Sequence, residues 1–442
     1  MSEPAPITVR RRRGRALFVV VEVVLLLAVP LLSVVGFRAV LDTTGSRVVD
    51  PELDPTEPGY EAVLARTPVA LVAGLDPAGG LDWVTVLVLS GAGERGGDVL
   101  LVPTGAMIDG VETSPGAAAG PPRTLAEVWA GEGQEGLAVA VATLLAASFS
   151  EVVVVDGARV TTLLEPVTPL AVANYGEVVV LGDDGDTSLT TEAGPVTLTA
   201  AEVPIYLGGP APDEPDLARL ARHDGFWRAW LSAVAVSDDP GVVPGEVTGG
   251  IARYVRGLAA GPVNVQVAPV VLSPTETGEG MAEPEAGPGA GDDVAVPLER
   301  FEVDLVALRA LANELIPFPG AATPGARVRV RVLDGVGEPG LASAAARAAV
   351  RGIGAEITVI GNAARFGVTA SRVVWIDESA EPAARRLAEM LGVTDLARVD
   401  GPSPFDDVDV TLVVGADLAA AYRSGGEVTV PPLTPDGGDP PG

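Results

Sequence analysis

Three charged residues fall at regular intervals near the middle of the chain: Asp216, Arg219 and Arg222. The apolar residues of 216–234 recur with a helical period, which predicts a helix on which positions three residues apart are neighbours. Guanidinium groups bind phosphates and carboxylates through paired hydrogen bonds. Two interpretations follow. The residues belong to an anion site, or Asp216 and Arg219 form an ordinary surface ion pair.

Two further titratable residues raise the same question. Asp76, in the sequence Leu-Asp-Pro, either belongs to a functional site or closes a turn. His223 is the only histidine, so a Ser-His-Asp triad would depend on it alone, and we expect it to be a surface residue of the predicted helix. The chain has no cysteine, which excludes disulfides, thiolate metal sites and a cysteine nucleophile.

Short β-branched runs indicate the strands that would position these residues. Between them, an alanine-rich stretch at 137–149 predicts a buried helix. Strands mixed with helices indicate an α/β or α+β layer fold, with a mixed sheet flanked by helices. The predicted strands cover 69–72, 84–89, 99–102 and 152–155.

The last part of the chain has a clear βαββαβ order, which predicts a four-stranded sheet with two helices on one face. Its strands are predicted at 328–333, 356–360, 372–376 and 409–414, and its helices at 341–352 and 382–391. Gly335, Gly337 and Gly340 shape the first strand-to-helix turn. A glycine-rich turn can also hold a phosphate at a helix N-terminus, but this one lacks the Walker lysine, so a structural turn is favoured.

The N-terminus predicts a membrane anchor. The apolar run 16–37 would span about 33 Å as a helix, close to the thickness of a bilayer core, and no small-residue cleavage site follows it. Glu22 within it either lies near the cytoplasmic face or contacts a partner helix. We therefore expect a single-pass plasma-membrane protein with a cytoplasmic N-terminus and most of the chain outside. The basic flank comprises Arg10, Arg11, Arg12, Arg13 and Arg15.

Composition excludes one class of partner. The net charge is −30, and all basic residues are arginines. Such an acidic chain repels phosphate backbones, so we expect a membrane protein that does not bind nucleic acid. The richness in alanine, valine, glycine and arginine is typical of a GC-rich bacterial genome.

Two parts of the sequence resemble a known family. The motifs R-V-R-V-L-D-G-V-G-E-P-G and D-V-D-V-T-L-V-V-G-A-D-L, within 327–420, resemble the LytR C-terminal domain found in LytR-CpsA-Psr proteins of Gram-positive envelopes. Residues 67–235 resemble the catalytic domain of that family more weakly. Asp76 follows the first predicted strand as the family's aspartate does. The D-x-x-R-x-x-R motif begins at Asp216, with His223 in place of the family's glutamine.

The resemblance implies an activity. Such enzymes transfer a glycopolymer from a polyprenyl pyrophosphate carrier to peptidoglycan, usually with magnesium, while arginines hold the pyrophosphate and an aspartate binds the metal. On this basis Asp76, Asp216, Arg219 and Arg222 would be the residual anion or lipid-phosphate site. Transfer at a pyrophosphate needs its developing negative charge neutralised by guanidinium groups and a hard cation.

The sequence departs from the family where that chemistry is concentrated. Asp82-Trp83-Val84-Thr85 stands where the family has Arg-Ser-Asp-Thr, and Pro103-Thr104-Gly105 where it has Pro-Arg-Asp. We therefore expect a non-catalytic relative, without catalytic residues, metal or cofactor. It would be a scaffold or binding partner for active family enzymes, polyprenyl-linked glycan or peptidoglycan.

Two alternatives remain open. In the first, an active transferase uses Mg²⁺ and binds phosphate with Arg219, Arg222 and either Arg123 or Arg159. In the second, the C-terminal domain binds the cell wall, and the middle domain only spaces it from the membrane. In all three cases the expected order is a cytoplasmic segment (1–15), the anchor (16–37), a spacer (38–66), the middle domain (67–272), a disordered linker with a short helix (273–326), the C-terminal domain (327–420) and a disordered tail (421–442).

Overall fold

The computed structural model describes residues 47–48, 53–90, 95–108, 122–181, 187–208, 214–239, 241–246, 249–272, 299–322, 325–399 and 408–424. The expected anchor, its arginine flank and Glu22 lie outside these residues and stay predictions. Within the described part of the chain, no helix is both long enough and apolar enough to cross a membrane.

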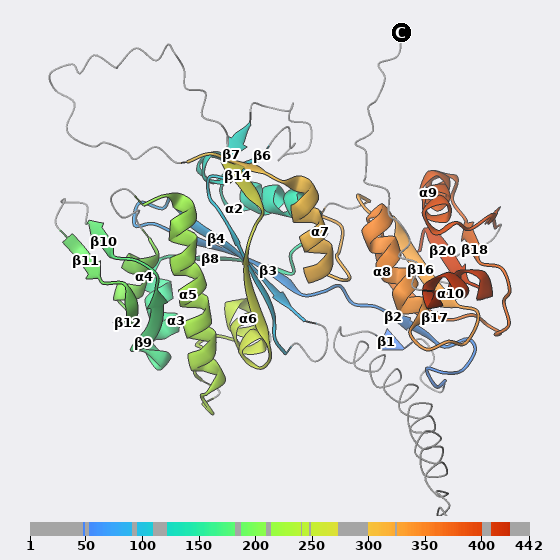
Figure 1. The fold of residues 1–442 in the computed structure, drawn as a ribbon, viewed down its shortest axis with the longest axis horizontal. Helices are drawn as coiled ribbons and strands as arrows, with labels where there is room; N and C mark the ends of the chain where they lie inside the picture. The colour runs from blue at the N-terminus through green and yellow to red at the C-terminus, as the bar shows by residue number, and fades with distance from the viewer. Residues whose placement is uncertain are drawn as a thin grey trace, which may run out of the picture. The chain divides into compact units, whose positions relative to one another are not determined.

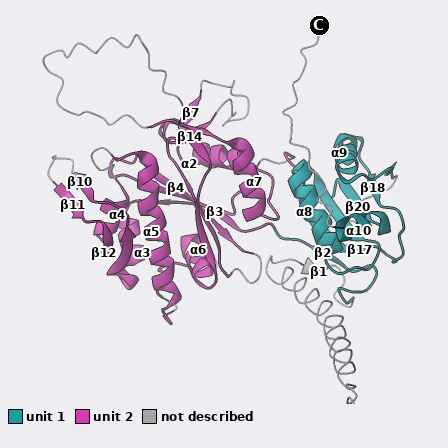
Figure 2. Ribbon diagram, in the orientation of Figure 1, with its two compact units in different colours: residues 1–65, 328–442 teal, residues 66–327 magenta. Residues whose placement is uncertain are grey.

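The chain forms two compact units, both of mixed α/β structure, which confirms the predicted fold class for the described residues (Figures 1 and 2). The middle unit spans residues 66–327. The C-terminal unit combines residues 1–65 with residues 328–442.

The middle unit is built on a five-stranded sheet in the order β13-β5-β4-β3-β8. The three central strands pair antiparallel, and each edge strand pairs parallel with its neighbour. The strands are β3 (Val69–Leu75), β4 (Leu81–Leu89), β5 (Gly97–Val102), β8 (Glu151–Val155) and β13 (Val263–Val267). All four predicted strands are therefore present.

Helices cover both faces of this sheet, which explains why β3 and β4 are almost continuously apolar rather than alternating. On one face, Ala70 and Val72 pack with residues of α3 (Gly157–Leu164), α5 (Asp216–Ala235) and α6 (Gly250–Ala259). On the other face, Val69 and Leu71 pack with α2 (Leu125–Leu145) and α7 (Leu305–Leu315).

The remaining elements of the middle unit are short. They are β6 (Met107–Ile108), β7 (Arg123–Thr124), η1 (Glu165–Val167), β9 (Leu170–Asn174), β10 (Val178–Leu181), β11 (Thr187–Thr191), β12 (Gly194–Leu198), α4 (Glu202–Leu207), β14 (Val270–Leu272) and β15 (Phe301–Val303).

Two segments of the middle unit differ from expectation. Helix α2 begins twelve positions before the predicted 137, because a capping box between Thr124 and Glu127 starts it and a kink at Gly133 (φ 64°) lets it continue through a glycine-rich stretch. Part of the expected linker is integral to the fold. Phe301 is fully buried, and the short helix predicted there is α7, which packs on α2.

The C-terminal unit has a seven-stranded sheet in the order β1-β2-β17-β16-β20-β18-β19. The six predicted elements are all present, but the predicted four-stranded sheet is too small. The elements are β1 (Arg47–Val48), β2 (Glu61–Val63), β16 (Arg329–Asp334), α8 (Leu341–Ile353), β17 (Glu356–Asn362), β18 (Arg372–Trp375), η2 (Glu378–Ala380), α9 (Glu381–Leu391), β19 (Asp395–Arg398), β20 (Val410–Val414) and α10 (Ala416–Arg423).

The additional strands are missed for different reasons. Strand β19 is four residues long and lacks a β-branched run, so its sequence carries little signal. Strands β1 and β2 come from the segment expected to be a spacer, more than 260 residues before β16. Their position in this sheet depends on a pairing that no local pattern encodes.

Candidate functional site

Helix α5 carries the predicted site, and three of its polar side chains point into the protein. Arg219, Arg222 and His223 are only 8%, 3% and 2% exposed. The interpretations of Arg219 and His223 as helix-surface residues are therefore wrong. The helix packs with one side against the sheet and another against α4, which leaves these three positions almost fully buried. Each of the three side chains is hydrogen-bonded, as buried polar groups require.

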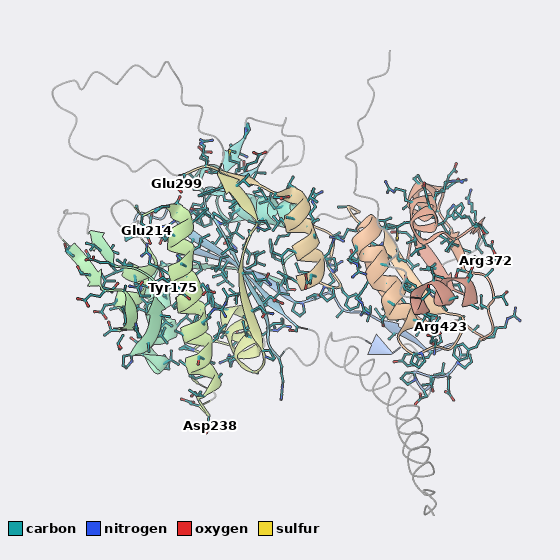
Figure 3. All side chains as sticks on the ribbon, in the orientation of Figure 1. Tyr175, Glu214, Asp238, Glu299, Arg372 and Arg423 are labelled. Carbon is teal, nitrogen blue, oxygen red and sulfur yellow. The ribbon has the colours of Figure 1, made fainter. Side chains whose placement is uncertain are left out.

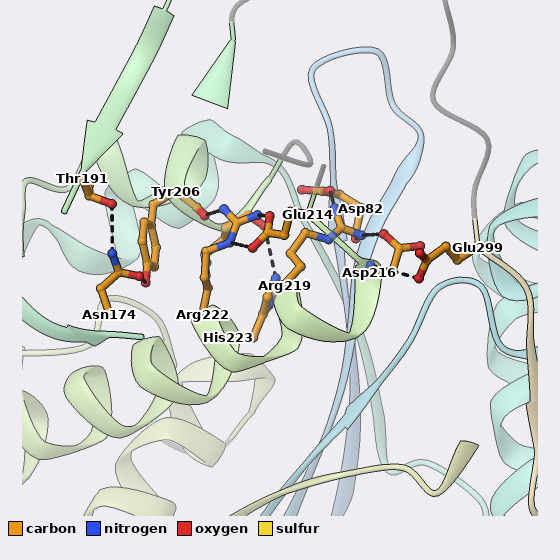
Figure 4. A network of polar contacts seen from close by, with 11 residues as sticks. Asp82, Asn174, Thr191, Tyr206, Glu214, Asp216, Arg219, Arg222, His223 and Glu299 are labelled. Atoms are coloured by element: carbon orange, nitrogen blue, oxygen red, sulfur yellow. Dashed lines mark hydrogen bonds and ion pairs between the residues drawn. The ribbon is translucent and has the colours of Figure 1, made fainter. Parts of the chain in front are cut away.

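Arg219 is bound by a carboxylate of the central sheet (Figure 4). Its Nη1 lies 2.8 Å from Oδ1 of Asp82, at the start of β4, and its Nη2 donates to the Asp82 carbonyl at 3.1 Å. Asp216 Oδ1 lies 3.7 Å from the same guanidinium. The expected Asp216–Arg219 pair therefore exists, but it is the weaker part of a buried interaction with Asp82.

Arg222 is bound in the same way by Glu214, two positions before the helix begins. Its Nε donates to Glu214 Oε1 at 3.0 Å, and its Nη2 donates to Glu214 Oε2, which makes the pair bidentate (Figure 4). Its Nη1 donates to the Tyr206 carbonyl. Burial lowers the pKa of Arg222, and the charge of Glu214 opposes that shift.

Arg222 is also held in place by uncharged side chains that are linked by hydrogen bonds. The Cζ of Arg222 lies 5.6 Å from the centre of the Tyr206 ring, and the Tyr206 hydroxyl donates to Asn174 Oδ1 at 3.1 Å. Asn174 in turn donates to Thr191 Oγ1 at 3.1 Å. Burial raises the pKa of Tyr206 to about 12, so the hydroxyl stays protonated and keeps donating. The position of Arg222 is thus determined from two sides.

His223 is a structural residue. Its Nε2 lies 3.1 Å from the Leu207 carbonyl, which can only accept, so this nitrogen carries the proton. The ring meets that of Trp83 edge-on, with centroids 5.9 Å apart. Burial, together with the charges of Arg219 and Arg222, lowers the pKa of His223 to about 3. It is therefore neutral and too weakly basic to take a proton from a substrate near pH 7.

Asp76 lies in the turn between β3 and β4, which confirms its interpretation as a turn residue. Its Oδ1 accepts from the Gly80 amide at 2.8 Å, and its carbonyl accepts from the Gly79 amide at 3.0 Å. It influences the site only through its charge. Burial raises the pKa of Asp82, Arg219 opposes this, and the carboxylate of Asp76 adds to the increase.

The other two arginines considered for a transferase are placed elsewhere. Arg123 pairs with Glu132 of α2, with Nη2 and Oε1 2.7 Å apart. Arg159 is exposed on α3. Neither is connected to Arg219 or Arg222 by a hydrogen bond or ion pair between described residues.

Sequence reasoning missed the partners that occupy the site. Asp82 was noticed only as a departure from the family, at a position where the family carries an arginine. The signal that could have identified it is the reversal of charge, since a new acid beside retained arginines predicts an ion pair. Glu214 carries no such signal, because it reaches Arg222 only after the chain turns into α5.

These carboxylates do not form a magnesium site. Among the described residues, no three or more His, Asp or Glu side chains gather so as to hold a metal ion. Asp76 accepts a hydrogen bond from the backbone of its turn, and Asp82 pairs with Arg219. Asp216 Oδ2 is buried without a hydrogen-bond partner, but the nearby guanidinium of Arg219 makes that oxygen a poor cation ligand. No step through Mg²⁺ follows from this geometry.

The comparisons with known proteins support the C-terminal assignment most directly. Residues 327–418 match the family described as "LytR cell envelope-related transcriptional attenuator". A search of the curated proteins found no match to the sequence.

Several solved structures are similar in fold. TagV of B. subtilis is 13% identical, with a TM-score of 0.41 over 58% of this chain and 99% of its own. The LytR-CPS2A-psr family protein YwtF (TagT) with bound octaprenyl pyrophosphate is 14% identical, with a TM-score of 0.37 over 60% and 91%. TagT bound to LIIa-WTA is 15% identical, with a TM-score of 0.40 over the same shares. The recognition made from the sequence is confirmed for the C-terminal domain, because residues 327–418 match the LytR C-terminal family.

Proposed function

We propose that this chain is a membrane-anchored, non-catalytic LytR-CpsA-Psr-like protein of the bacterial cell envelope. It acts as a scaffold or binding partner in the assembly of cell-wall glycopolymers. The family match of the C-terminal domain supports the envelope role, and the predicted anchor supports the location. Its proposed partners are active enzymes of the family and polyprenyl-linked glycan.

One observation carries the non-catalytic part of the proposal. Both arginines that the resemblance assigns to the pyrophosphate are buried against carboxylates of this chain, Arg219 with Asp82 and Arg222 with Glu214. With Asp216 included, two guanidinium groups face three carboxylates. An incoming pyrophosphate would meet a site that is already neutralised. It would also leave one of these acids buried without its cation, which costs several kcal/mol.

The proposal is tested with the full-length protein in detergent, an octaprenyl-pyrophosphate-linked glycopolymer as donor, peptidoglycan as acceptor, and Mg²⁺ present. The informative variant is Asp82→Asn/Arg219→Gln, which removes both charges of the 2.8 Å pair and so leaves neither of these two residues as an unpaired buried ion. We expect no glycopolymer transfer in either protein. We also expect the same lipid affinity in both, because the pyrophosphate does not contact Arg219.

Two results would contradict this. Transfer by the wild-type protein that the double variant lacks would establish the transferase alternative. Retention of the full-length protein on isolated peptidoglycan, with no lipid bound and no family enzyme retained from membranes, would favour the structural wall-binding alternative.

A further inference from the structure

The C-terminal domain is completed by a segment from the other end of the chain. Strand β2 pairs antiparallel with β17, with Val63 opposite Val359. The pairing continues beyond the strand at both ends. The Asn362 amide donates to the Tyr60 carbonyl at 2.7 Å, and the Leu64 amide donates to the Thr358 carbonyl at 2.9 Å. The family match begins at residue 327, so β2 lies outside it.

The side chains show that this pairing is specific. Tyr60 and Ala62 are 2% and 0% exposed. The Asn362 amide group donates to the carbonyls of Pro55 and Glu57, at 2.9 and 2.7 Å. A strand placed on this edge without sequence preference would not form these contacts.

Two further contacts fix the register. Glu61 pairs with Arg331 of β16 across the intervening strand, and the two side chains are only 14% and 16% exposed. A Cβ on Gly361 would lie 2.2 Å from the Tyr60 carbonyl oxygen, so only glycine allows the two backbones to approach this closely. A shift by one residue would place a side chain at that contact.

The length of chain between the expected membrane span and β1 limits how far the C-terminal domain can lie from the membrane. The expected span ends at residue 37, and β1, which pairs with β2, begins at Arg47. The nine intervening residues reach about 32 Å when fully extended, at about 3.5 Å per residue. Residues 66–327 are inserted between β2 and β16, so they do not lie along the path from the membrane to the C-terminal sheet.

We propose that the chain's own juxtamembrane strand β2 holds the LytR C-terminal domain at the outer face of the membrane. There the domain meets membrane-bound partners rather than the distant wall. This inference rests on the proposed function, since it needs the predicted anchor. It disagrees with the alternative in which the middle domain spaces the C-terminal domain from the membrane.

The pairing of β2 with β17 is tested by disulfide formation. The natural chain has no cysteine, so the two introduced thiols are the only ones that can cross-link. Val63 and Val359 form a non-hydrogen-bonded pair, whose Cα separation of about 4.5 Å suits a disulfide. We expect Val63→Cys/Val359→Cys in the full-length protein to cross-link in native membranes. The matched control, Val63→Cys/Ile360→Cys, places the two thiols on opposite faces and should not. Absence of the first cross-link would overturn the proposal.

The distance from the membrane is tested by energy transfer. A donor dye is attached to Ser424→Cys, an exposed position, in vesicles that carry an acceptor on the lipid headgroup. A flexible Gly/Ser linker of about forty residues, with a reach of about 35 Å, is inserted within 38–46 or, as the control, between Ala65 and Arg66. We expect the first insertion to lower the transfer efficiency and the second to leave it unchanged.

The outcomes separate the two proposals. Equal effects of the two insertions would refute the juxtamembrane position of the domain. A chain that does not float with the vesicles, yet still forms the Val63–Val359 cross-link, would refute the predicted anchor and leave the strand docking intact.

Discussion

The two units of this protein differ in how deeply their main ion pairs are buried. In the middle unit, the ion pairs of Arg219 and Arg222 are enclosed, with the side chains of Arg219 and Asp82 both 10% exposed. In the C-terminal unit, most ion pairs lie at the surface, such as that of Arg372, whose side chain is 55% exposed, with Asp395 (Figure 3). The exception is Glu61–Arg331, which joins β2 to the sheet.

The sequence motifs of the two units differ in a related way. The glycine-rich motif of the C-terminal unit acts through its backbone conformation. Asp334 accepts from the amides of Val336 and Gly337, and Gly337 adopts a φ of 85°, which favours glycine. The D-x-x-R-x-x-R motif of the middle unit consists of charged side chains. What such side chains can bind depends on which charged partners surround them. The following predictions test this contrast, from the largest effect to the smallest.

Removing the carboxylate partner of Arg219 should have the largest effect. We expect Asp82→Ala to lower the free energy of unfolding of the middle unit by about 3 kcal/mol, because it leaves a buried guanidinium without its main partner. Urea unfolding followed by tryptophan fluorescence measures this, since four of the five tryptophans lie in the middle unit. The double variant Asp82→Asn/Arg219→Gln should lose much less. Equal losses in the two proteins would show that the charge pair itself is not what matters.

The single histidine should make the middle unit sensitive to acid. The pKa of His223 is about 3 in the folded protein and about 6.5 when unfolded, so below pH 6.5 the unfolded state binds a proton that the folded state does not. The stability is therefore complete above pH 6.5 and falls as the pH decreases, by about 2 kcal/mol between pH 7.5 and 5.

His223→Gln is the matched control, because an amide nitrogen can still donate to the Leu207 carbonyl and does not titrate. The difference in unfolding free energy between the two proteins, followed across this pH range, isolates the histidine. A pH-independent difference would show that His223 is accessible to protons in the folded state.

The turn of the C-terminal unit should respond more moderately. Asp334→Ala removes the acceptor of two backbone amides, so we expect a loss of about 1–2 kcal/mol. Trp375, the only tryptophan of the C-terminal unit, reports this unfolding step. Asp334→Asn keeps an acceptor oxygen and should recover most of the loss. If the middle unit were destabilised equally, the two units would not be unfolding separately.

The exposed pairs of the C-terminal unit should matter least. Asp395→Ala removes the partner of Arg372, and we expect a change below about 0.5 kcal/mol that disappears at high salt. A loss comparable with that of Asp82→Ala would remove the contrast between the two units.

The amino-acid sequence by itself determined most strands of both sheets, all except β1, β2, β13 and β19, and the identity of the C-terminal domain. The reason is that apolar periods, glycines at positive φ and the Asp334 turn act over a few neighbouring residues. Burial of β3 and β4 on both faces could likewise be read from their continuous apolar runs.

Two features were decided only by the tertiary structure. The carboxylate of Asp82 reaches Arg219 from 137 positions away, and that of Glu214 reaches Arg222 only because the chain turns into α5 between them. Strand β2 joins a sheet whose other strands lie far along the chain, apart from its short neighbour β1. Both depend on which distant groups become neighbours after folding. A carboxylate has the same local signature whether it later meets water or a buried guanidinium.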